Sequence, residues 1–441
     1  MYWEELDKTL FHNQMNLKER SPLMLPEYIK NILEQKEKPV DMYLDRHRKR
    51  HYADQNCLII LKAFSSSMPI LLNYAKGNEN YSGGGFYIRW NGYGIAVDPG
   101  YRFIERLHEA GYSVLDIDVV IVTHEHIDHT HDIRLLDDLH YNASRQNREH
   151  EYRWDSDLFS IVRNPAVPHK ISWYMDPVTC EMIQVFSKKQ SGFDCDYNNI
   201  YCVNVDPDET EKLRSKFEKF AEVITDSDIK IESNVIMHVF QTRHETLGDK
   251  AKNTVFFKHT YGCVFECISI DKESQYIGYT SDTSLCEAKI YDAYRRMLEQ
   301  LQKCQVIIAN ISGIYEDDVL LKSAKGRHLG YRGCYKIVYD ILMKDDSKLK
   351  YYLLSEFSNQ VSDIRYDISK YLQREVVKVA RQADKEAPLV LPAEIDLTIS
   401  LDSYGVQCSA CGKYSKNIHI LRPFGENQKL RYVCDECVYS L

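Results

Sequence analysis

Four side chains that can bind a metal ion occur within six consecutive residues of this sequence. His124, His126, Asp128 and His129 come shortly after the apolar run 119–122, so they begin where a strand is predicted to end. Neutral imidazole and carboxylate groups are ligands that zinc, manganese and iron accept. A strand end also holds such side chains rigidly at the edge of a sheet. The spacing therefore predicts a metal centre at a sheet edge.

A second candidate metal site lies near the C-terminus. Cys408 and Cys411 form one Cys-x-x-Cys pair, and Cys434 and Cys437 form another. Each pair can place two thiolates on one tetrahedral ion, and this arrangement is typical of a zinc ribbon. So short a segment buries too little apolar surface to fold without the metal. The sequence therefore predicts one structural zinc ion bound by the four thiolates.

The elements that must position the first cluster are strands and amphipathic helices in alternation. The segment 132–139, directly after the cluster, has a helical pattern. Apolar runs interleaved with such helices are typical of a layered α/β domain. The runs predicted to be strands are 86–90, 94–97, 119–122, 171–174, 235–240, 276–279, 306–309 and 352–354.

Length and composition limit the class of protein. The 441 residues exceed the ~250–300 at which a single core stops growing, which predicts one large domain with appended segments. No apolar stretch approaches the ~18 residues that cross a bilayer, and the first residues lack the pattern of a signal peptide. The 13 cysteines, an odd number, suit a reducing compartment, so a cytoplasmic protein without membrane contact is expected. A net charge of −9 argues against a surface that coats long nucleic acids.

Three parts of the chain differ in texture. Residues 1–55 form a polar, helix-prone extension, in which 26–33 carry apolar side chains at helical spacing. Residues 56–400 form the layered domain, and their polar stretch at about 187–233 has the texture of an insertion. Residues 401–441 form the ribbon-like segment, whose basic and aromatic side chains suit contact with a nucleic acid. A contact between two copies of the chain, as in a homodimer, and a cap on the C-terminus are the alternatives.

Several of these motifs together resemble one family. The His-x-His-x-Asp-His pattern of residues 124–129, placed after an apolar strand, resembles the signature of the metallo-β-lactamase fold superfamily. Residues 94–100 resemble the strand and aspartate that precede this signature. Residues 240–244 resemble the strand that ends at a third histidine, and 278–283 the strand that ends at a bridging aspartate. The resemblance covers about 56–400 and implies a four-layer αββα sandwich.

The resemblance implies a ligand set for two divalent ions: His124, His126 and His244 on the first, Asp128 and His129 on the second, and Asp282 between them. Asp98 is implied to orient a ligand histidine. His238 and His259 are alternatives to His244, which we prefer because it follows a predicted strand. Zinc is expected, with manganese or iron as alternatives. Two ions ~3.5–4 Å apart can hold a shared hydroxide near neutral pH, so hydrolysis without a protein nucleophile is expected.

Two further segments resemble the phosphodiesterase branch that includes the tRNA-processing enzyme RNase Z. In that branch a histidine before a helix supplies a proton to the leaving oxygen, and a later strand ends in a histidine that binds the second ion. This chain matches the first feature at His328 and departs from the second, because Glu356 stands where the histidine is expected. Either Glu356 is the last ligand and His328 the general acid, or His328 binds the ion and Glu356 supports it. We favour the first assignment.

The resemblance predicts a metal-dependent hydrolase, with phosphodiester cleavage as the leading reaction. His328 and Asp128 are the expected catalytic residues, since a positioned acid contributes typically ~10²–10⁴-fold. Arg327 and Arg332 flank His328 and are expected to hold substrate phosphates, although plain solvent exposure explains them equally well. The expected substrate is RNA, DNA or a small or cyclic nucleotide. The alternatives are hydrolysis of a carboxylic ester, lactone, thioester or β-lactam, and a non-enzymatic scaffold.

Overall fold

The computed structural model describes residues 38–48, 56–65, 70–71, 73–74, 81, 83–147, 152–155, 160–163, 169–190, 192–242, 244, 259–269, 273–285, 291–313, 328–357, 364–422 and 429–439. The chain divides into two compact units, Met1–Arg50 and His51–Leu441. The described part of the first unit is helix α3 (Pro39–Arg48) with the residue before it. The helix predicted at 26–33 lies outside the described residues, and the domain boundary at 55 stays a prediction.

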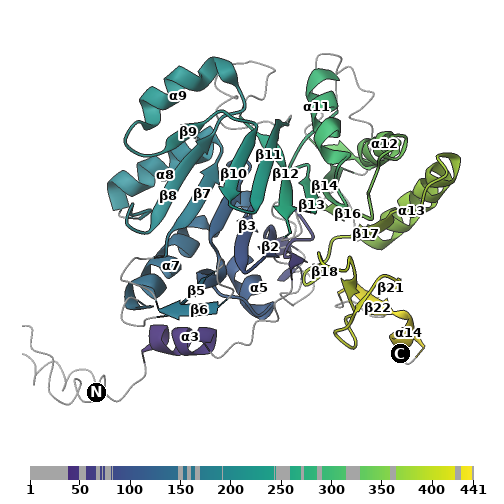
Figure 1. The fold of residues 1–441 in the computed structure, drawn as a ribbon, viewed down its shortest axis with the longest axis horizontal. Coiled ribbons are helices and arrows are strands. Elements are labelled where there is room, and N and C mark those ends of the chain that lie inside the picture. Colours follow the sequence, from purple (N-terminus) through teal and green to yellow (C-terminus); the bar gives the residue numbers. More distant parts are fainter. Residues whose placement is uncertain are drawn as a thin grey trace, which may run out of the picture. The chain divides into compact units, whose positions relative to one another are not determined.

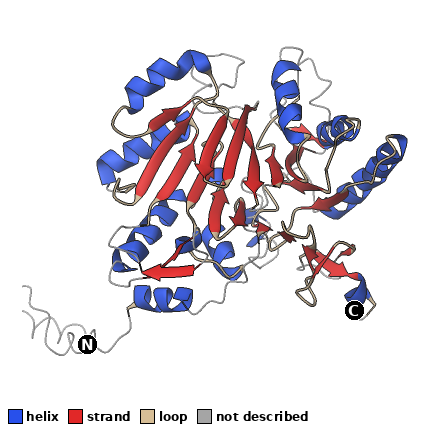
Figure 2. Cartoon of the chain, in the orientation of Figure 1, coloured by secondary structure: helices blue, strands red, loops and turns tan. Residues whose placement is uncertain are grey.

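Two large sheets form the centre of the second unit (Figures 1 and 2). The first sheet has ten strands in the order β20 (Tyr414–Ser415), β19 (Val406–Gln407), β18 (Thr398–Ser400), β1 (Cys57–Ile60), β2 (Phe86–Trp90), β3 (Tyr93–Val97), β4 (Val119–Val122), β7 (Ile171–Met175), β8 (Asn198–Val203) and β9 (Glu222–Ile224). The second has the order β10 (Asp228–Glu232), β11 (Val235–Gln241), β12 (Tyr261–Ile268), β13 (Ser274–Tyr279), β14 (Val306–Gly313), β16 (Tyr351–Ser355) and β17 (Leu389–Pro392), with β15 (Leu329–Gly330) beside β14. Every strand that the sequence predicts is present.

The strand directions gather the functional segments at one end of each sheet. Strand β4 pairs in parallel with β3 and β7, and β14 pairs in parallel with β13 and β16. Parallel strands bring their carboxyl ends to the same edge, which is where α/β proteins place their ligand sites. The residues after β3, β4, β13 and β16 are those that the sequence singles out.

The core lies mainly between the sheets, and side-chain alternation along β14 shows how it is divided. Val306 and Ile308 pack into the core that both sheets share. Ile307 and Ala309 point the other way and pack with the helices outside the second sheet. Successive strand residues face opposite sides, and each fully buried aliphatic side chain contributes about 1.5–3 kcal/mol. The apolar run 306–309 therefore buries side chains on both faces of the second sheet.

Helices cover the outer faces of the two sheets (Figure 1). On the second sheet, α11 lies against β11 and β12, α12 against β14, and α13 against β17; on the first sheet, α8 lies against β8 and α9 against β9. The helices of the unit are α5 (Phe103–Glu109), η2 (Val114–Asp116), α6 (Ile127–Thr130), α7 (Ile133–Asn147), α8 (Pro177–Gln190), η3 (Pro207–Glu209), α9 (Thr210–Phe217), α11 (Tyr291–Leu301), α12 (Tyr331–Leu342), α13 (Arg365–Gln382) and α14 (Asp435–Val438). The predicted αββα sandwich is confirmed.

Smaller elements complete the unit. Strands β5 (Tyr152–Asp155) and β6 (Ser160–Arg163) form one hairpin, and β21 (Ile418–Leu421) and β22 (Arg431–Cys434) form another. The segment predicted as an insertion at about 187–233 contributes β8 and β9 to the edge of the first sheet and β10 to the edge of the second. The ribbon-like segment contributes β19 and β20 to the opposite edge of the first sheet.

Among the described residues, no helix combines the length and the apolar character that a bilayer crossing requires.

Candidate active site

The first ligand group consists of His124, His126, His244 and Asp282, whose ligand atoms all lie within 4.8 Å of one another. Nε2 of His244 is 3.0 Å from Nδ1 of His126. Oδ2 of Asp282 is 3.8 Å from Nε2 of His124 and 3.7 Å from Nε2 of His244. Side chains from both sheets thus converge, and the space between their ligand atoms fits a single ion.

The second ligand group consists of Asp128, His129 and Glu356, again within 4.8 Å. Nε2 of His129 is 3.4 Å from Oε2 of Glu356 and 3.7 Å from Oδ2 of Asp128. Oδ2 of Asp282 is 3.8 Å from the same His129 nitrogen. Asp282 therefore faces both groups, as a bridging ligand must.

The donor atoms of both groups fit metal ions. Nε2 of His124, Nε2 of His129 and Oε2 of Glu356 are buried and have no hydrogen-bond partner among the described residues. Buried polar atoms normally have a hydrogen-bond partner. Three such atoms without one, all directed into the site, fit the binding of a metal ion. Burial, with the neighbouring histidines, holds the pKa of His124 well below its usual value. This imidazole is therefore neutral, as a metal ligand must be.

The turn that carries Asp128 depends on a glycine. A Cβ atom on Gly100 would lie 1.9 Å from the carbonyl oxygen of Asp128. Only glycine allows this approach, so the loop after β3 packs directly on the first turn of α6. The Asp-Pro-Gly sequence before the motif thus positions one of its ligands.

Asp98 orients one of the imidazoles. Its Oδ2 lies 2.8 Å from Nδ1 of His129. The carboxylate also accepts hydrogen bonds from the backbone N–H and the hydroxyl of Thr123, both at 2.8 Å, and is fully buried. Because Nδ1 of His129 donates to this carboxylate, Nε2 keeps its lone pair for the second ligand group. The sequence predicts that Asp98 orients a ligand histidine, and this hydrogen bond is compatible with that role.

Three residues at the site have a left-handed backbone. Asp98 has a φ of 49°, Ser281 of 52° and Glu356 of 61°, and they follow strands β3, β13 and β16. This conformation costs roughly 1–2 kcal/mol for a residue with a side chain. Such strain clusters at functional sites, where the surrounding structure enforces it. Here the chain turns sharply as each strand ends, which holds the side chains at the sheet edge.

Tyr279 and Asn310 support the site and were not predicted from the sequence. The hydroxyl of Tyr279 donates to Oδ2 of Asp98 at 2.8 Å. The Nδ2 group of Asn310 donates to Oδ1 of Asp282 at 3.0 Å, which leaves Oδ2 for the ligand groups. Tyr279 is the last residue of the predicted strand 276–279 and Asn310 directly follows the predicted strand 306–309, and neither position gives a hint of a polar partner.

Lys62 is the most important residue that sequence reasoning missed. Its ammonium group is buried and lies 2.9 Å from Oε1 of Glu356 and 3.3 Å from Oδ2 of Asp128. Burial alone would lower the pKa of Lys62, but Asp128 and Glu356, with Asp282, raise it above its usual value. The one available signal was its place directly after the apolar run 58–61, where a charged side chain must have a partner.

His328 lies beside the first ligand group, directly before β15 and α12. Its ring centroid is 4.7 Å from that of His244, and its Nδ1 is 3.3 Å from Oδ2 of Asp282. Its side chain is 31% exposed, whereas that of Glu356 is 2% exposed. His328 therefore reaches both the ligand cluster and the surface. Burial opposes protonation of His328, but Asp282 raises its pKa above the usual value.

Other predicted residues are placed as follows. Arg332 is exposed in the first turn of α12, and Arg327 lies outside the described residues. His238 is not part of the cluster, because its ring nitrogens lie 2.7 Å from Oδ1 of Asp228 and 3.0 Å from Oε2 of Glu266. The preference for His244 over His238 thus agrees with the geometry.

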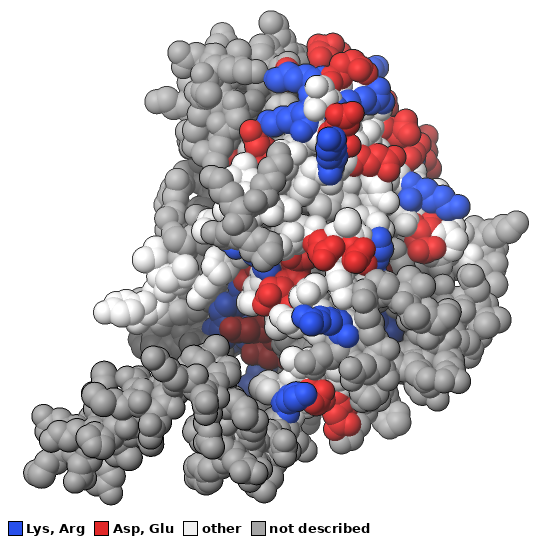
Figure 3. All heavy atoms as spheres, turned by 90° about the vertical axis from the view of Figure 1, so that its left-hand side faces the viewer, with Lys and Arg blue, Asp and Glu red and all other residues white. Residues whose placement is uncertain are grey.

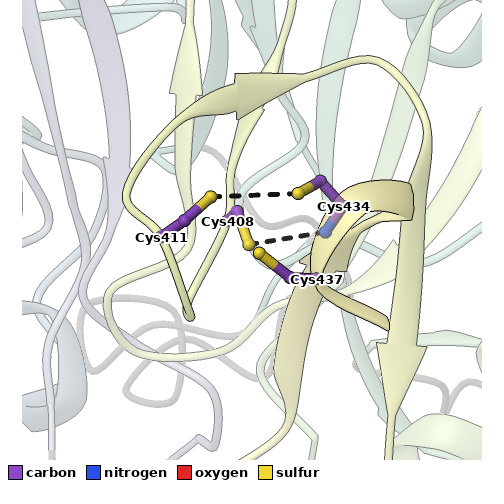
Figure 4. Close-up of side chains that lie close together, drawn as sticks. All are labelled: Cys408, Cys411, Cys434 and Cys437. Carbon is purple, nitrogen blue, oxygen red and sulfur yellow. Dashed lines mark hydrogen bonds between the residues drawn. The ribbon is translucent and has the colours of Figure 1, made fainter. Parts of the chain in front are cut away.

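The four C-terminal cysteines converge as well (Figure 4). Sγ of Cys411 lies 3.8 Å from Sγ of Cys434. The backbone N–H groups of Ala410 and Cys434 both donate to Sγ of Cys408 at 3.4 Å. Although burial opposes it, these backbone donors lower the pKa of Cys408 to about 6. A thiolate held in this way is ready to bind zinc.

Charges of both signs are interspersed among the described residues on the face shown in Figure 3. Figure 3 shows acidic and basic side chains side by side on the face that includes α9. The ion pairs Lys212–Glu209, Arg214–Glu211 and Lys216–Glu181 lie in this region. Interspersed charges of both signs do not attract a polyanion along a broad front.

Comparisons with known proteins agree with the fold. Residues 86–175 match the family model described as the metallo-β-lactamase superfamily. Ribonuclease Z of Thermobifida fusca (strain YX) is 46% identical over 46 residues, which are 10% of this chain and 14% of that protein. The aligned part thus spans only a small share of the curated relative.

Solved structures with a similar fold include human tRNase Z, short form, with 12% identity and a TM-score of 0.47 over 78% of this chain and 99% of that chain. The metallo-β-lactamase fold protein YhfI from Bacillus subtilis has 12% identity and a TM-score of 0.46 over 78% and 98%. A long form RNase Z from yeast has 10% identity and a TM-score of 0.44 over 87% and 48%.

The expected resemblance to the metallo-β-lactamase superfamily, and to RNase Z within it, is confirmed by the family model and the curated relative. The fold is a metallo-β-lactamase fold. Together with the two ligand groups, it indicates that the chain is a metal-dependent hydrolase.

Proposed function

We propose that this hydrolase is a phosphodiesterase or nuclease that cleaves RNA, DNA or a small or cyclic nucleotide. The observation that carries the proposal is the position of His328, which borders the first ligand group and is partly exposed. An alkoxide that leaves phosphorus near neutral pH needs a proton, and a histidine between the ligand cluster and the surface can deliver it. Hydrolysis of an activated ester or a lactone has no such requirement.

In this proposal Glu356, and not His328, completes the second ligand group. Support comes from the distances, because Glu356 groups with Asp128 and His129, whereas His328 contacts Asp282 from the side of His244. The ring nitrogen of His328 that does not face Asp282 would then donate its proton to the leaving oxygen. Arg332 and Arg327 are proposed to hold phosphate groups of the substrate.

The proposed cofactors are two divalent ions in the active site and one structural zinc ion in the ribbon. When bound, the two active-site ions would activate water for attack and polarise the scissile phosphate. Zinc suits the three histidines of the first group, while the carboxylates of the second group shift its preference towards manganese or iron. Asp128 and Asp282 would fix the position of the ions with respect to His328.

The remaining parts of the proposal concern the whole chain. We divide it into a helical extension at 1–55, a hydrolase domain at 56–400 and a zinc-ribbon-like segment at 401–441. The ribbon is proposed to contact the nucleic-acid substrate or a second copy of the chain. The many cysteines outside the ribbon suit a reducing environment, which favours a cytoplasmic location.

The test uses metal-loaded protein, bis(p-nitrophenyl) phosphate, a panel of nucleotides and single-stranded oligonucleotides, and a matched panel of esters and lactones. We expect His328→Gln to lower phosphodiester hydrolysis by about 10²–10⁴-fold at unchanged metal content. His169→Gln is the control, because His169 is similarly exposed and instead contacts the carbonyl oxygen of Ile117. If wild-type protein cleaves esters or lactones and no phosphodiester, the alternative class of hydrolase is correct.

A further inference from the structure

Lys62 is a buried cation whose ammonium group contacts two members of the second ligand group, Asp128 and Glu356. Its side chain is 2% exposed. Its ammonium group donates to the carbonyl oxygen of Asp128 at 3.0 Å, to Oδ2 of Asp128 at 3.3 Å, and lies 2.9 Å from Oε1 of Glu356. An ammonium group has three donors, and these three acceptors account for all of them.

The backbone brings Lys62 to Glu356. Phe64 forms a parallel bridge with Phe357, and the N–H of Phe357 donates to the carbonyl oxygen of Ala63 at 3.2 Å. The hydroxyl of Ser355 reaches the carbonyl oxygen of Lys62 at 3.4 Å. The segment after β1 therefore runs beside the segment after β16. The pairing of the two side chains is part of the fold and does not depend on a flexible surface lysine.

The two oxygens of Glu356 have different surroundings. Oε1 receives Lys62 and, at 3.4 Å, the hydroxyl of Tyr279. Oε2 is buried, has no hydrogen-bond partner among the described residues and faces Nε2 of His129 at 3.4 Å. Lys62 thus occupies one oxygen and leaves the other directed at the ligand group. An ammonium that took the place of the second ion would instead bond to Oε2.

The charges around Lys62 also indicate that it supports the second ligand group and does not replace the ion. Asp128 and Glu356 belong to the second ligand group and Asp282 faces it, and the ammonium group of Lys62 contacts Asp128 and Glu356. A buried charge without a partner is strongly destabilising. Lys62 and Glu356 together carry no net charge, as a neutral imidazole carries none. The pair can therefore stand where a single neutral ligand would otherwise be needed.

We propose that Lys62 is a positioning residue for the second metal ion, and that the Lys62–Glu356 ion pair acts as one neutral ligand whose free oxygen, Oε2, binds the ion. The inference rests on the proposed two-ion centre and deepens it. It predicts that Glu356 cannot be replaced alone without loss of the second ion, that loss of Lys62 alone destabilises mainly the metal-free protein, and that a suitable joint replacement preserves the ion.

The test is a double-mutant cycle on the full chain with Lys62→Met, Glu356→His and the double variant. Each protein is stripped of metal, reloaded with manganese or zinc and analysed for metal content, and the ribbon ion contributes equally to all of them. Glu356→His leaves Lys62 beside an imidazole, so we expect affinity for the second ion to fall by about 10–100-fold. The double variant should recover most of that loss, because the charge of the site returns to its original value.

Lys62→Met alone gives a second readout that does not require activity. Without the ammonium, Asp128 and Glu356 repel each other until an ion binds, so the melting temperature should fall much further in metal-free protein than in loaded protein. The control is Lys378→Met, in which the lysine is 65% exposed and pairs with Glu375 on α13. A lysine with a merely structural role would lower both melting temperatures equally, as would a general packing defect.

Three outcomes would overturn the proposal. The effects of the two single variants on second-ion affinity could be additive, in which case the residues do not act as a unit. The melting temperatures of Lys62→Met could fall equally with and without metal. Lys62→Met could also gain an ion that wild-type protein lacks, which would mean that the ammonium occupies the second site. Wild-type protein with a single active-site ion that no variant increases would instead refute the two-ion centre, and with it the proposed function.

Discussion

The two metal-ligand clusters of this chain are built in opposite ways. The ribbon site takes Cys408 and Cys411 from the turn between β19 and β20, and Cys434 and Cys437 from the junction of β22 with α14, and nearby backbone N–H groups support the Cys408 thiolate. The active-site groups take their side chains from the ends of strands in two different sheets. A local site can be recognised from spacing and folds around its ion. The other exists only after the whole sandwich has formed, and its ligands are held by partners distant in sequence.

The largest effect on hydrolysis is expected from Asp282→Asn. Oδ2 of Asp282 faces both ligand groups, so an amide there weakens both ions at once. We expect a rate loss larger than the roughly 10²–10⁴-fold predicted for the acid His328, since removal of the ions also removes the activated water. Elemental analysis should show a loss of active-site ions with the ribbon ion retained. The control is the exposed Asp292→Asn on α11, and normal metal content in Asp282→Asn would refute a bridging role.

A smaller effect is expected from Asp98→Asn, which acts through a ligand without touching the ion. The change weakens the hydrogen bond to Nδ1 of His129 that fixes the ring. Residues of this kind typically contribute about 10–100-fold to metal affinity, so the second ion should bind more weakly by that factor. Titration of metal-free protein with manganese measures it. Asp138→Asn, an exposed change on α7, should have no effect, and a loss of the first ion before the second would contradict the assignment.

A still smaller effect is expected at Ile127, which lies between two ligands and is 68% exposed. A substrate that covers this side chain gains about 1 kcal/mol from it, or roughly fivefold in KM. Ile127→Ser should therefore raise KM for a nucleotide or oligonucleotide substrate and leave kcat and metal content unchanged. Leu135→Ser, an exposed change on α7, provides the comparison. A change in kcat alone would mean that Ile127 shapes the metal turn and does not contact substrate.

The smallest effect on hydrolysis, and the largest on the ribbon, is expected from Cys434→Ser. One zinc ion should be lost, and residues 406–439 should become sensitive to protease, because the local site folds around its metal. Hydrolysis of bis(p-nitrophenyl) phosphate should change by less than the roughly fivefold expected for Ile127→Ser, with the exposed Cys195→Ser as control. A larger fall would show that loss of the ribbon ion affects the active site. The buried ion pair Arg365–Glu394 could couple the two, since Glu394 also accepts a hydrogen bond from the backbone N–H of Leu430.

The contrast between the clusters also explains what could be predicted from the sequence. The spacing of the ligands in 124–129 and of the four cysteines was enough to predict two metal sites. His244 and Asp282 could be predicted as ligands because each follows a predicted strand. Lys62 could not be predicted, because its role depends on Glu356, and their contact follows from the bridge between Phe64 and Phe357.

The sequence does not reveal which segments lie at sheet edges. The polar segment 187–233, predicted to be an insertion, contains β8 and the edge strand β9 of the first sheet and the edge strand β10 of the second, where polar side chains are tolerated on the solvent side. The segment predicted to form the ribbon also extends the first sheet, since β19 pairs with β18 and β20 pairs with β19. Composition cannot reveal such pairings, since edge strands are short and carry little apolar periodicity.

The attachment of β19 and β20 to the first sheet has a consequence for protein handling and for cells short of zinc. Strand β19 pairs with β18 and β20 pairs with β19, and the turn between β19 and β20 carries Cys408 and Cys411. If the ion is removed and the two short strands peel away, β18 presents unpaired N–H and C=O groups to any neighbouring chain. If the ribbon binds zinc as proposed, we expect zinc-depleted protein to self-associate and precipitate.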